Sequence, residues 1–250
     1  MSGSEYTQVI SRLIRDFETR EMSHLHDLGE RLAQSIISGH VVHVYDNGHM
    51  LNHELFNRAG GLALLAQLNI TRPTITNIIV RRPSDTEPPS SLQDNHIDIA
   101  LARFAIERSS MIPGDSLLIG SVSGRSPFIV ELALQARQAG IHTIALTALR
   151  YTQSLPALHP TGKLLYQVAD EMIDIQTEEG DASVHLDGLE EKIAPTSGIM
   201  ATVAMWTLEV EIAQALLKKG VTPTVFRSVN YPDGPERLAA AHHRFAELGY

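Results

Sequence analysis

Hydrophobic and polar positions along the chain alternate between helical spacing and short, uniformly apolar runs. The segment Glu5–Ser38 repeats apolar residues every three or four positions, which predicts one long helix or two stacked helices. Further helical patterns lie at Met50–Arg58, Ile97–Arg108, Pro127–Gly140, Leu164–Ala169, Thr196–Lys219 and Glu236–Leu248. Apolar runs typical of strands lie at Val41–Tyr45, Leu62–Leu68, the stretch just before Ser121, Ile141–Ala148 and Met172–Ile175.

Strands that alternate with helices through long connections predict a parallel sheet covered by helices on both faces. No linker interrupts the pattern, so we expect one domain over residues 1–250, with an N-terminal helical arm at 1–38 and a C-terminal helix at 230–250. Ligands of such sheets bind at the carboxyl ends of the strands. The chain segments expected at that edge are the loops Asp46–His49 and Ser121–Ser126 and the loop after Ile175.

Three other stretches carry weaker patterns. The segment Asn69–Ser91 is polar and rich in proline, which is typical of a long flap or surface excursion. Arg150–Lys163 reads as irregular, and Gly180–Ala194 as a loop or a small hairpin. None of them changes the predicted sheet.

The loop between the third predicted strand and its helix contains Ser121, Ser123 and Ser126 around Gly124. Its hydroxyls and backbone N–H groups would lie at the positive end of the helix, which favours an anion. No Gly-x-Gly-x-x-Gly follows a strand, so a sugar phosphate is favoured over a dinucleotide. The alternative is a tight turn in which Ser123 or Ser126 only caps the helix.

The amino-acid composition and the net charge of the chain exclude several kinds of site and partner. The chain has 43% hydrophobic and 20% charged residues and no cysteine, which excludes disulfides, thiolate metal sites and a cysteine nucleophile. A net charge of −9 argues against a nucleic-acid partner. No apolar run was expected to reach the ~20 residues of a membrane span, and Met1–Tyr6 is polar, so we expect a cytoplasmic protein without a membrane partner.

Ser121, Ser123, Gly124 and Ser126 match the phosphate-binding pattern Ser-x-Ser-Gly-x-Thr/Ser of the SIS (sugar isomerase) domain. The chain resembles a single-domain branch of that family, in segments spread over nearly its whole length: Arg58–Leu62, His159–Lys163, Val168–Asp170, Gly180–Ala182, Pro195–Ser197 and Val225–Ser228. The stretch Lys192–Ser197 is also similar to a loop of N-acetylmuramic acid 6-phosphate etherase, and the family includes phosphoheptose isomerase. The resemblance implies a three-layer α/β/α SIS fold with a flavodoxin-like, five-stranded parallel sheet.

The first loop departs from the family pattern. Where that pattern reads Gly-x-Gly-x-Ser, this chain reads Asp46-Asn47-Gly48-His49-Met50. Asn47 and Gly48 stay candidates for ligand binding, but the Asp46 carboxylate would repel a phosphate unless a cation intervened. The ligand then either sits differently or carries an amine or hydroxyl that Asp46 recognises.

Enzymes of this family move protons beside a carbonyl or eliminate across a carbon–oxygen bond, which requires a carboxylate base and often a histidine. The most economical catalytic set is Glu54 as the base, with His49 or His53 acting on the ring oxygen or leaving group. The alternative is that Glu54 and Arg58, four residues apart, simply pair on a helix surface.

Further candidates for binding the phosphate are Arg125, which is optional, and Lys192, Thr196 and Ser197 near the start of a predicted helix. His49 and His53 have a spacing that can share a metal, but no third ligand is evident, so we expect neither a metal nor a cofactor.

The favoured function is isomerisation of a phosphorylated sugar or amino sugar. An etherase-like lyase and a non-catalytic phosphosugar-binding module are the alternatives; a dinucleotide-binding protein is a weaker third possibility. The apolar faces of the N-terminal helix and of Thr196–Lys219 offer more surface than one sheet covers, and SIS domains typically pair. We therefore expect a homodimer or a higher homo-oligomer.

Overall fold

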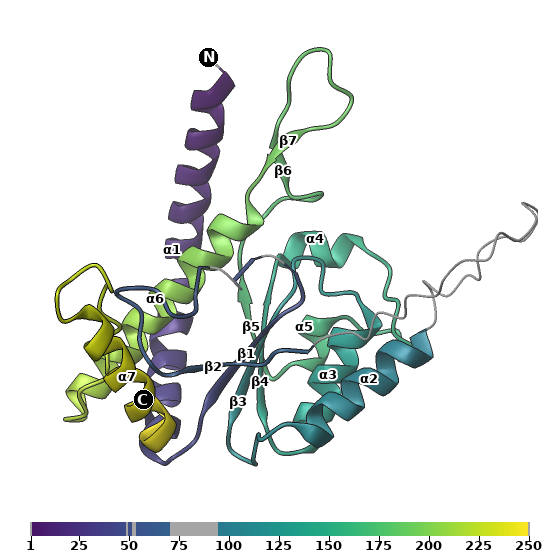
Figure 1. The fold of residues 1–250 in the computed structure, drawn as a ribbon. Coiled ribbons are helices and arrows are strands. Elements are labelled where there is room, and N and C mark those ends of the chain that lie inside the picture. Colours follow the sequence, from purple (N-terminus) through teal and green to yellow (C-terminus); the bar gives the residue numbers. More distant parts are fainter. Residues whose placement is uncertain (1, 49, 52–53, 71–94, 250) are drawn as a thin grey trace, which may run out of the picture.

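The computed structural model describes residues 2–48, 50–51, 54–70 and 95–249 (Figure 1). Its centre is a sheet of five parallel strands in the order β2-β1-β3-β4-β5. The strands are β1 (Val42–Asp46), β2 (Leu65–Gln67), β3 (Ser116–Gly120), β4 (His142–Thr147) and β5 (Glu171–Asp174). The predicted flavodoxin-like sheet is confirmed. The single-domain organisation stays a prediction.

Helices cover the sheet on both faces (Figure 1). One face carries α1 (Ser2–Ile37) and α6 (Ser197–Lys218), with α7 (Gly234–Leu248) outside α6. The other carries α2 (Asn95–Arg108), α3 (Pro127–Gln138) and α5 (Leu165–Val168), while α4 (Leu149–Ser154) lies at the carboxyl end of the strands. This arrangement confirms the three-layer α/β/α fold.

The central strands are buried on both faces because their apolar side chains alternate between two cores. In β3, Leu118 belongs to the core beneath α1 and α6, whereas Leu117 and Ile119 belong to the core beneath α2 and α3. The sheet register pairs Asp46 with Gly120 and Gly120 with Leu146, so β1, β3 and β4 end at nearly the same level. The loops that follow them are therefore neighbours.

The N-terminal segment forms a single 36-residue helix, not two stacked helices. Its first half projects beyond the sheet beside an antiparallel hairpin of β6 (Ala182–Val184) and β7 (Ile193–Pro195) (Figure 1). The Tyr6 hydroxyl donates to the Pro195 carbonyl at 2.7 Å and joins the two. The hairpin was one of the two forms expected for Gly180–Ala194.

The helical segment expected at 50–58 is wrong for the residues that the structure describes. Residues 50–51 form a bend and 54–57 form turns. The Leu55 N–H donates to the Leu51 carbonyl at 3.0 Å, which closes one helical turn, and Asn57 then adopts a positive φ of 57° that ends it. The stretch expected to be irregular, 150–163, contains most of the short helix α4.

Helix α6 corrects the expectation that no apolar segment could span a membrane. Its 22 residues are long and apolar enough by length and composition. Half of the relevant window is nevertheless buried inside the protein, and Met200, Leu208 and Ile212 belong to the core shared with α1. Core helices of soluble proteins pass the same test of length and composition, and the buried side chains of α6 make it a helix of this core. The cytoplasmic location stays a prediction.

Candidate functional site

A cleft of about 320 Å³ opens at the carboxyl end of the sheet. Its walls come from the ends of β1 and β3, from α4 and from the start of the β6–β7 hairpin. The lining residues are Asp46, Asn47, Gly48, Met50, Ser121, Val122, Ser123, Tyr151, Gly180 and Asp181. The prediction that the first loop and the serine loop share one edge of the sheet is confirmed.

The serine loop, Ser121–Ser126, is held to the sheet and curled on itself. The Ser121 N–H donates to the Leu146 carbonyl at 3.0 Å, and the Ser121 hydroxyl oxygen accepts the Gly124 N–H at 3.3 Å. Gly124 has a φ of +56°, and a Cβ there would approach Thr152 Cγ2 to 3.1 Å. The left-handed backbone conformation therefore favours glycine, and a Cβ would in addition force the neighbouring Thr152 side chain to shift by a few tenths of an ångström.

Thr147 at the end of β4 and Thr152 on α4 fix the serine loop at Val122. The Val122 carbonyl accepts hydrogen bonds from Thr147 Oγ1 at 3.0 Å, Thr152 Oγ1 at 3.3 Å and the Ala148 N–H at 3.1 Å. Thr147 and Thr152 are fully buried. No local sequence pattern points to either residue, because each acts on a loop more than twenty positions away.

The N-terminus of α3 follows the loop directly. Ser126 occupies the N-cap position and Pro127 begins the helix, yet the Ser126 hydroxyl makes no capping hydrogen bond. Ser123 lines the cleft, half-buried. The Arg125 Nε is buried without a hydrogen-bond partner in the described part of the chain. Within the described part of the chain, the Ser123 and Ser126 hydroxyls therefore have no hydrogen-bond partner, and they lie near the positive end of a helix.

The first loop is held internally. The Asp46 side chain is buried, and its Oδ2 accepts the Leu51 N–H at 2.8 Å. The Asn47 N–H donates to the Gly120 carbonyl at 2.9 Å, and its Oδ1 accepts the Tyr45 hydroxyl at 3.3 Å. Asp46 thus has a structural task, holding the bend after β1, beside the recognition role considered from the sequence.

A carboxylate that the sequence analysis did not single out sits at the N-terminus of α6. Asp181 Oδ1 accepts the N–H groups of Thr196 at 3.0 Å and Ser197 at 2.7 Å, and Oδ2 accepts the Ser197 hydroxyl at 2.6 Å. Asp181 holds a positive φ of 65°. The donors predicted to bind phosphate at Thr196 and Ser197 are therefore bonded to this side chain, which also lines the cleft.

Of the remaining candidates that the structure describes, Lys192 and Glu54 do not line the cleft. Lys192 on the hairpin pairs with Glu178 at 3.6 Å and is half-exposed. Glu54 is 52% exposed and pairs with Arg58 at 3.3 Å, as the surface-pair alternative expected. Glu54 also lines a second groove, of about 520 Å³, that shares Met50 with the cleft. His49 and His53 lie outside the described residues.

Within the described ranges, no three histidine or acidic side chains gather closely enough to hold a metal ion.

Comparison with known proteins agrees with this geometry. A family model for the SIS domain matches residues 5–148, more than half of the chain. The chain belongs to the SIS domain family. The UPF0309 protein lmo0025 of Listeria monocytogenes is 30% identical over 247 residues, which cover 98% of this chain and 97% of that protein. The UPF0309 protein ABC0887 of Shouchella clausii is 29% identical over 239 residues, covering 92% and 91%.

Among solved structures, phosphoheptose isomerase GmhA from Neisseria gonorrhoeae superposes with a TM-score of 0.50, covering 85% of this chain and 95% of that chain. The two sequences are 14% identical, so the likeness concerns the fold. Within this fold, the first three residues of the motif, Ser121, Val122 and Ser123, line the cleft at the carboxyl end of the sheet.

Proposed function

We propose that the protein binds a phosphorylated sugar or amino sugar in the cleft and isomerises it by proton transfer through a carboxylate. The observation that carries the proposal is the serine loop. It places Ser121 and Ser123 on the wall of a cleft and ends at the positive N-terminus of α3. Membership of the SIS family and the fold of a phosphoheptose isomerase support a phosphosugar as the ligand.

The phosphate is proposed to lie against Ser121, Ser123 and the start of α3. Asp46 and Asp181 line the other walls of the cleft, and their charges would repel a phosphate placed against them. Arg125 is a further candidate partner, since its buried Nε lacks a partner in the described part of the chain. Lys192, Thr196 and Ser197 take a lesser part, because each already bonds to a carboxylate of the chain.

Glu54 stays our proposed base, with His49 and His53 as the proposed partners for the ring oxygen or leaving group. The groove that contains Glu54 adjoins the cleft at Met50, so an extended sugar bound by its phosphate could reach toward Glu54. A non-catalytic phosphosugar-binding module is the second candidate. It is favoured by one observation, namely that the Glu54 carboxylate is exposed and already paired with Arg58. An etherase-like lyase would use the same groups.

A thermal-shift screen tests the binding step. It should use hexose, hexosamine, heptose and sugar-acid phosphates beside their unphosphorylated forms. A ligand at 100 times its Kd stabilises the fold by about 2.7 kcal/mol. We expect stabilisation by at least one phosphorylated form and none by its unphosphorylated counterpart.

A matched pair of serine variants shows whether the serine loop is responsible. Ser123→Ala should weaken phosphosugar binding at nearly unchanged Tm. Ser11→Ala removes an exposed hydroxyl of α1, bonded only to the Thr7 carbonyl, and should bind as the wild type does. Equal affinity in both variants would reduce the loop to a turn and refute the proposed site.

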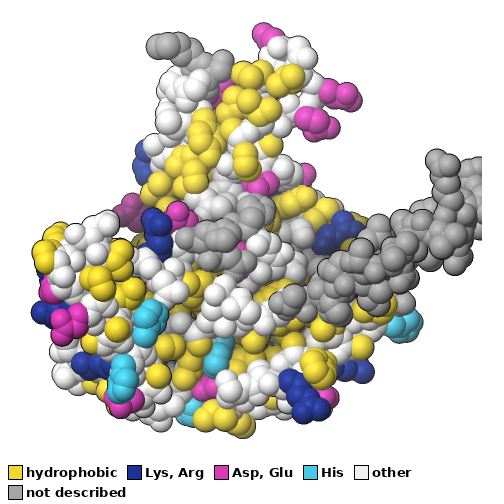
Figure 2. All heavy atoms as spheres, in the orientation of Figure 1, with side chains coloured by type: hydrophobic (Ala, Val, Ile, Leu, Met, Phe, Trp, Pro, Cys, Tyr) yellow, Lys and Arg dark blue, Asp and Glu magenta, His cyan; other side chains and the backbone are white. Residues whose placement is uncertain are grey.

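We further propose a homodimer or a higher homo-oligomer. Apolar side chains gather over the projecting hairpin and the start of α6 (Figure 2), and Leu189, Ile193 and Ile199 are each at least 40% exposed. Such a surface is costly on a monomer. Sedimentation at micromolar concentration should give at least a dimer, and a monomer would contradict the proposal.

A further inference from the structure

Tyr151 is a cleft residue that neither the serine motif nor the proposed catalytic set includes. Its side chain lines the cleft and packs, half-buried, against the core beneath α1 and α6. The hydroxyl of Tyr45, in β1, is by contrast used within the fold, because it donates to Asn47 Oδ1 at 3.3 Å. Within the described ranges the Tyr151 hydroxyl has no hydrogen-bond partner. A phenol placed in a cleft in this way has both an apolar ring and an unused polar group to offer.

The backbone that carries Tyr151 is firmly attached to the sheet. The Leu149 N–H donates to Asp174 Oδ1 at 3.0 Å where β5 ends. Thr152, the next residue after Tyr151, bonds Thr147 Oγ1 at 2.9 Å and the Val122 carbonyl of the serine loop at 3.3 Å. Tyr151 is therefore held at a fixed position relative to the proposed phosphate site, as a selective binding residue must be.

The negative charges of Asp46 and Asp181 favour one orientation of the ligand in the cleft. The phosphate is placed at the serine loop, away from the carboxylates Asp46 and Asp181, for the reason given above. The rest of the ligand then extends along the walls formed by α4 and by Gly180–Asp181. Sugar hydroxyls can donate to carboxylates, and sugar C–H groups pack on aromatic rings, so this part of the cleft suits a polyol.

On this basis, which rests on the proposed function, we infer that Tyr151 contacts the sugar and not the phosphate of the ligand. Its ring packs against the C–H face of the sugar, and its hydroxyl bonds a sugar hydroxyl. Tyr151 thereby distinguishes a phosphosugar from a bare phosphate, while the serine loop binds the phosphate that both share.

The test compares two kinds of probe on several variants by isothermal titration. The probes are fructose 6-phosphate and glucosamine 6-phosphate on one side and inorganic phosphate on the other. Tyr151→Phe should weaken sugar-phosphate binding about fivefold through the lost hydrogen bond, and Tyr151→Ala about tenfold or more through the lost ring as well. Neither variant should change the affinity for inorganic phosphate by more than about twofold.

Two control variants complete the comparison. Ser123→Ala should weaken the binding of all three probes. Tyr231→Phe changes an exposed tyrosine whose ring packs on Arg227, and should weaken none. Because Tyr151→Phe keeps the ring that packs in the core, it remains informative if Tyr151→Ala fails to fold.

The outcomes separate this inference from the proposed function. Unchanged sugar-phosphate affinity in Tyr151→Phe and Tyr151→Ala, or an equal loss for inorganic phosphate, overturns the role of Tyr151 and leaves phosphosugar binding intact. If the wild-type protein binds none of the phosphorylated sugars of the thermal-shift panel, the proposed function fails, and the inference fails with it.

Discussion

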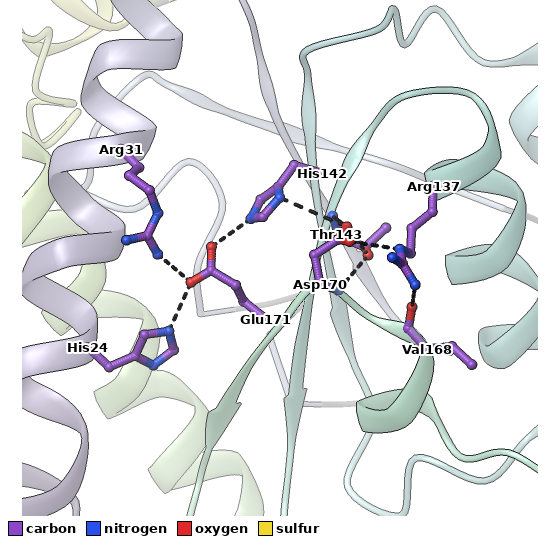
Figure 3. Close-up of polar contacts among 8 residues, drawn as sticks. All are labelled: His24, Arg31, Arg137, His142, Thr143, Val168, Asp170 and Glu171. Carbon is purple, nitrogen blue, oxygen red and sulfur yellow. Dashed lines mark hydrogen bonds and ion pairs between the residues drawn. The ribbon is translucent and has the colours of Figure 1, made fainter.

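The two ends of the parallel sheet each gather polar side chains from several elements, but they use them differently. The carboxyl end carries the cleft. The amino ends of β4 and β5 carry a network that joins the sheet to α1 and α3 (Figure 3). We call it the edge network; its members are His24, Arg31, Arg137, His142, Thr143, Val168, Asp170 and Glu171.

Every side chain of the edge network that carries a charge has a partner of the opposite charge. Glu171 accepts from His24 at 3.1 Å and from His142 at 2.8 Å, and also pairs with Arg31. Asp170 pairs with Arg137 at 2.7 Å. Burial alone would raise the pKa of Glu171, but the hydrogen bonds from His24 and His142 outweigh it and lower that pKa.

In the cleft, by contrast, the Ser123 and Tyr151 hydroxyls have no partner within the described ranges. A polar group that is already satisfied contributes to stability, whereas one that the fold leaves unused in a cleft is available to a ligand. The difference teaches that the number of polar residues in a cluster says little about function. Whether the fold itself uses their hydrogen-bonding capacity says more.

The largest expected effect belongs to the cleft region. Glu54→Gln keeps the shape of the side chain and removes the proposed base, so turnover should fall by about two to four orders of magnitude. Substrate affinity and Tm should stay nearly unchanged. Steady-state kinetics on an identified substrate measure this, and full activity in the variant would leave Glu54 as a surface partner of Arg58.

The next largest effect is on the pH dependence of stability, and it concerns a carboxyl group that belongs neither to the cleft nor to the edge network. Glu209 on α6 is buried and accepts the Leu62 N–H at 2.9 Å. Burial raises its pKa from 4.5 to about 7. A raised pKa means that its contribution to stability is full below pH 4.5 and is lost as the pH rises through about 7, a change of up to about 3 kcal/mol.

Glu209→Gln should remove this part of the pH dependence, because the amide oxygen can still accept the Leu62 N–H. Urea unfolding of both proteins at pH 5 and pH 8 gives the comparison. The variant should gain relative to the wild type at pH 8. Parallel changes in the two proteins would show that Glu209 does not titrate in this range.

A substitution in the edge network is expected to have a smaller effect, and to change only the free energy of unfolding. Glu171→Ala leaves His24, Arg31 and His142 without their shared carboxylate and should lower the free energy of unfolding by about 2 kcal/mol. Phosphosugar affinity should not change.

The matched control is Glu178→Ala, which removes partly exposed pairs with Arg12 at 3.1 Å and with Lys192 at 3.6 Å and should cost less than about 1 kcal/mol. Urea unfolding measures both variants. A loss of ligand affinity in Glu171→Ala, at unchanged stability, would break the distinction between the two ends of the sheet.

The smallest effect is expected at the rim. Arg58→Ala removes the exposed pair with Glu54 and should change the free energy of unfolding by no more than about 0.5 kcal/mol. Urea denaturation can resolve a larger change, and a loss above 1 kcal/mol would show that this pair belongs with the structural networks.

The sequence by itself determined the features of this protein that are set by residues close to one another along the chain, namely its helices, its strands and the serine loop. The apolar runs of β1, β3 and β4 and the helical periodicity of α1 and α6 predicted the parallel sheet and its two helical layers. The serine loop was predicted as well, because a strand, a glycine-containing turn and a helix follow one another within a short stretch.

Only the tertiary structure decided which groups share the cleft and which of them are in use. Tyr151 and Asp181 reach it from α4 and from the base of the hairpin, and Thr152 fixes a loop thirty positions away, so no local pattern points to them. Asp181 occupies the donors of Thr196 and Ser197 that the sequence had offered to a phosphate. The physical reason is that a hydrogen bond forms only between groups that are close in space. The spacing of two residues in the sequence determines their distance in space only when both lie in the same helix or strand.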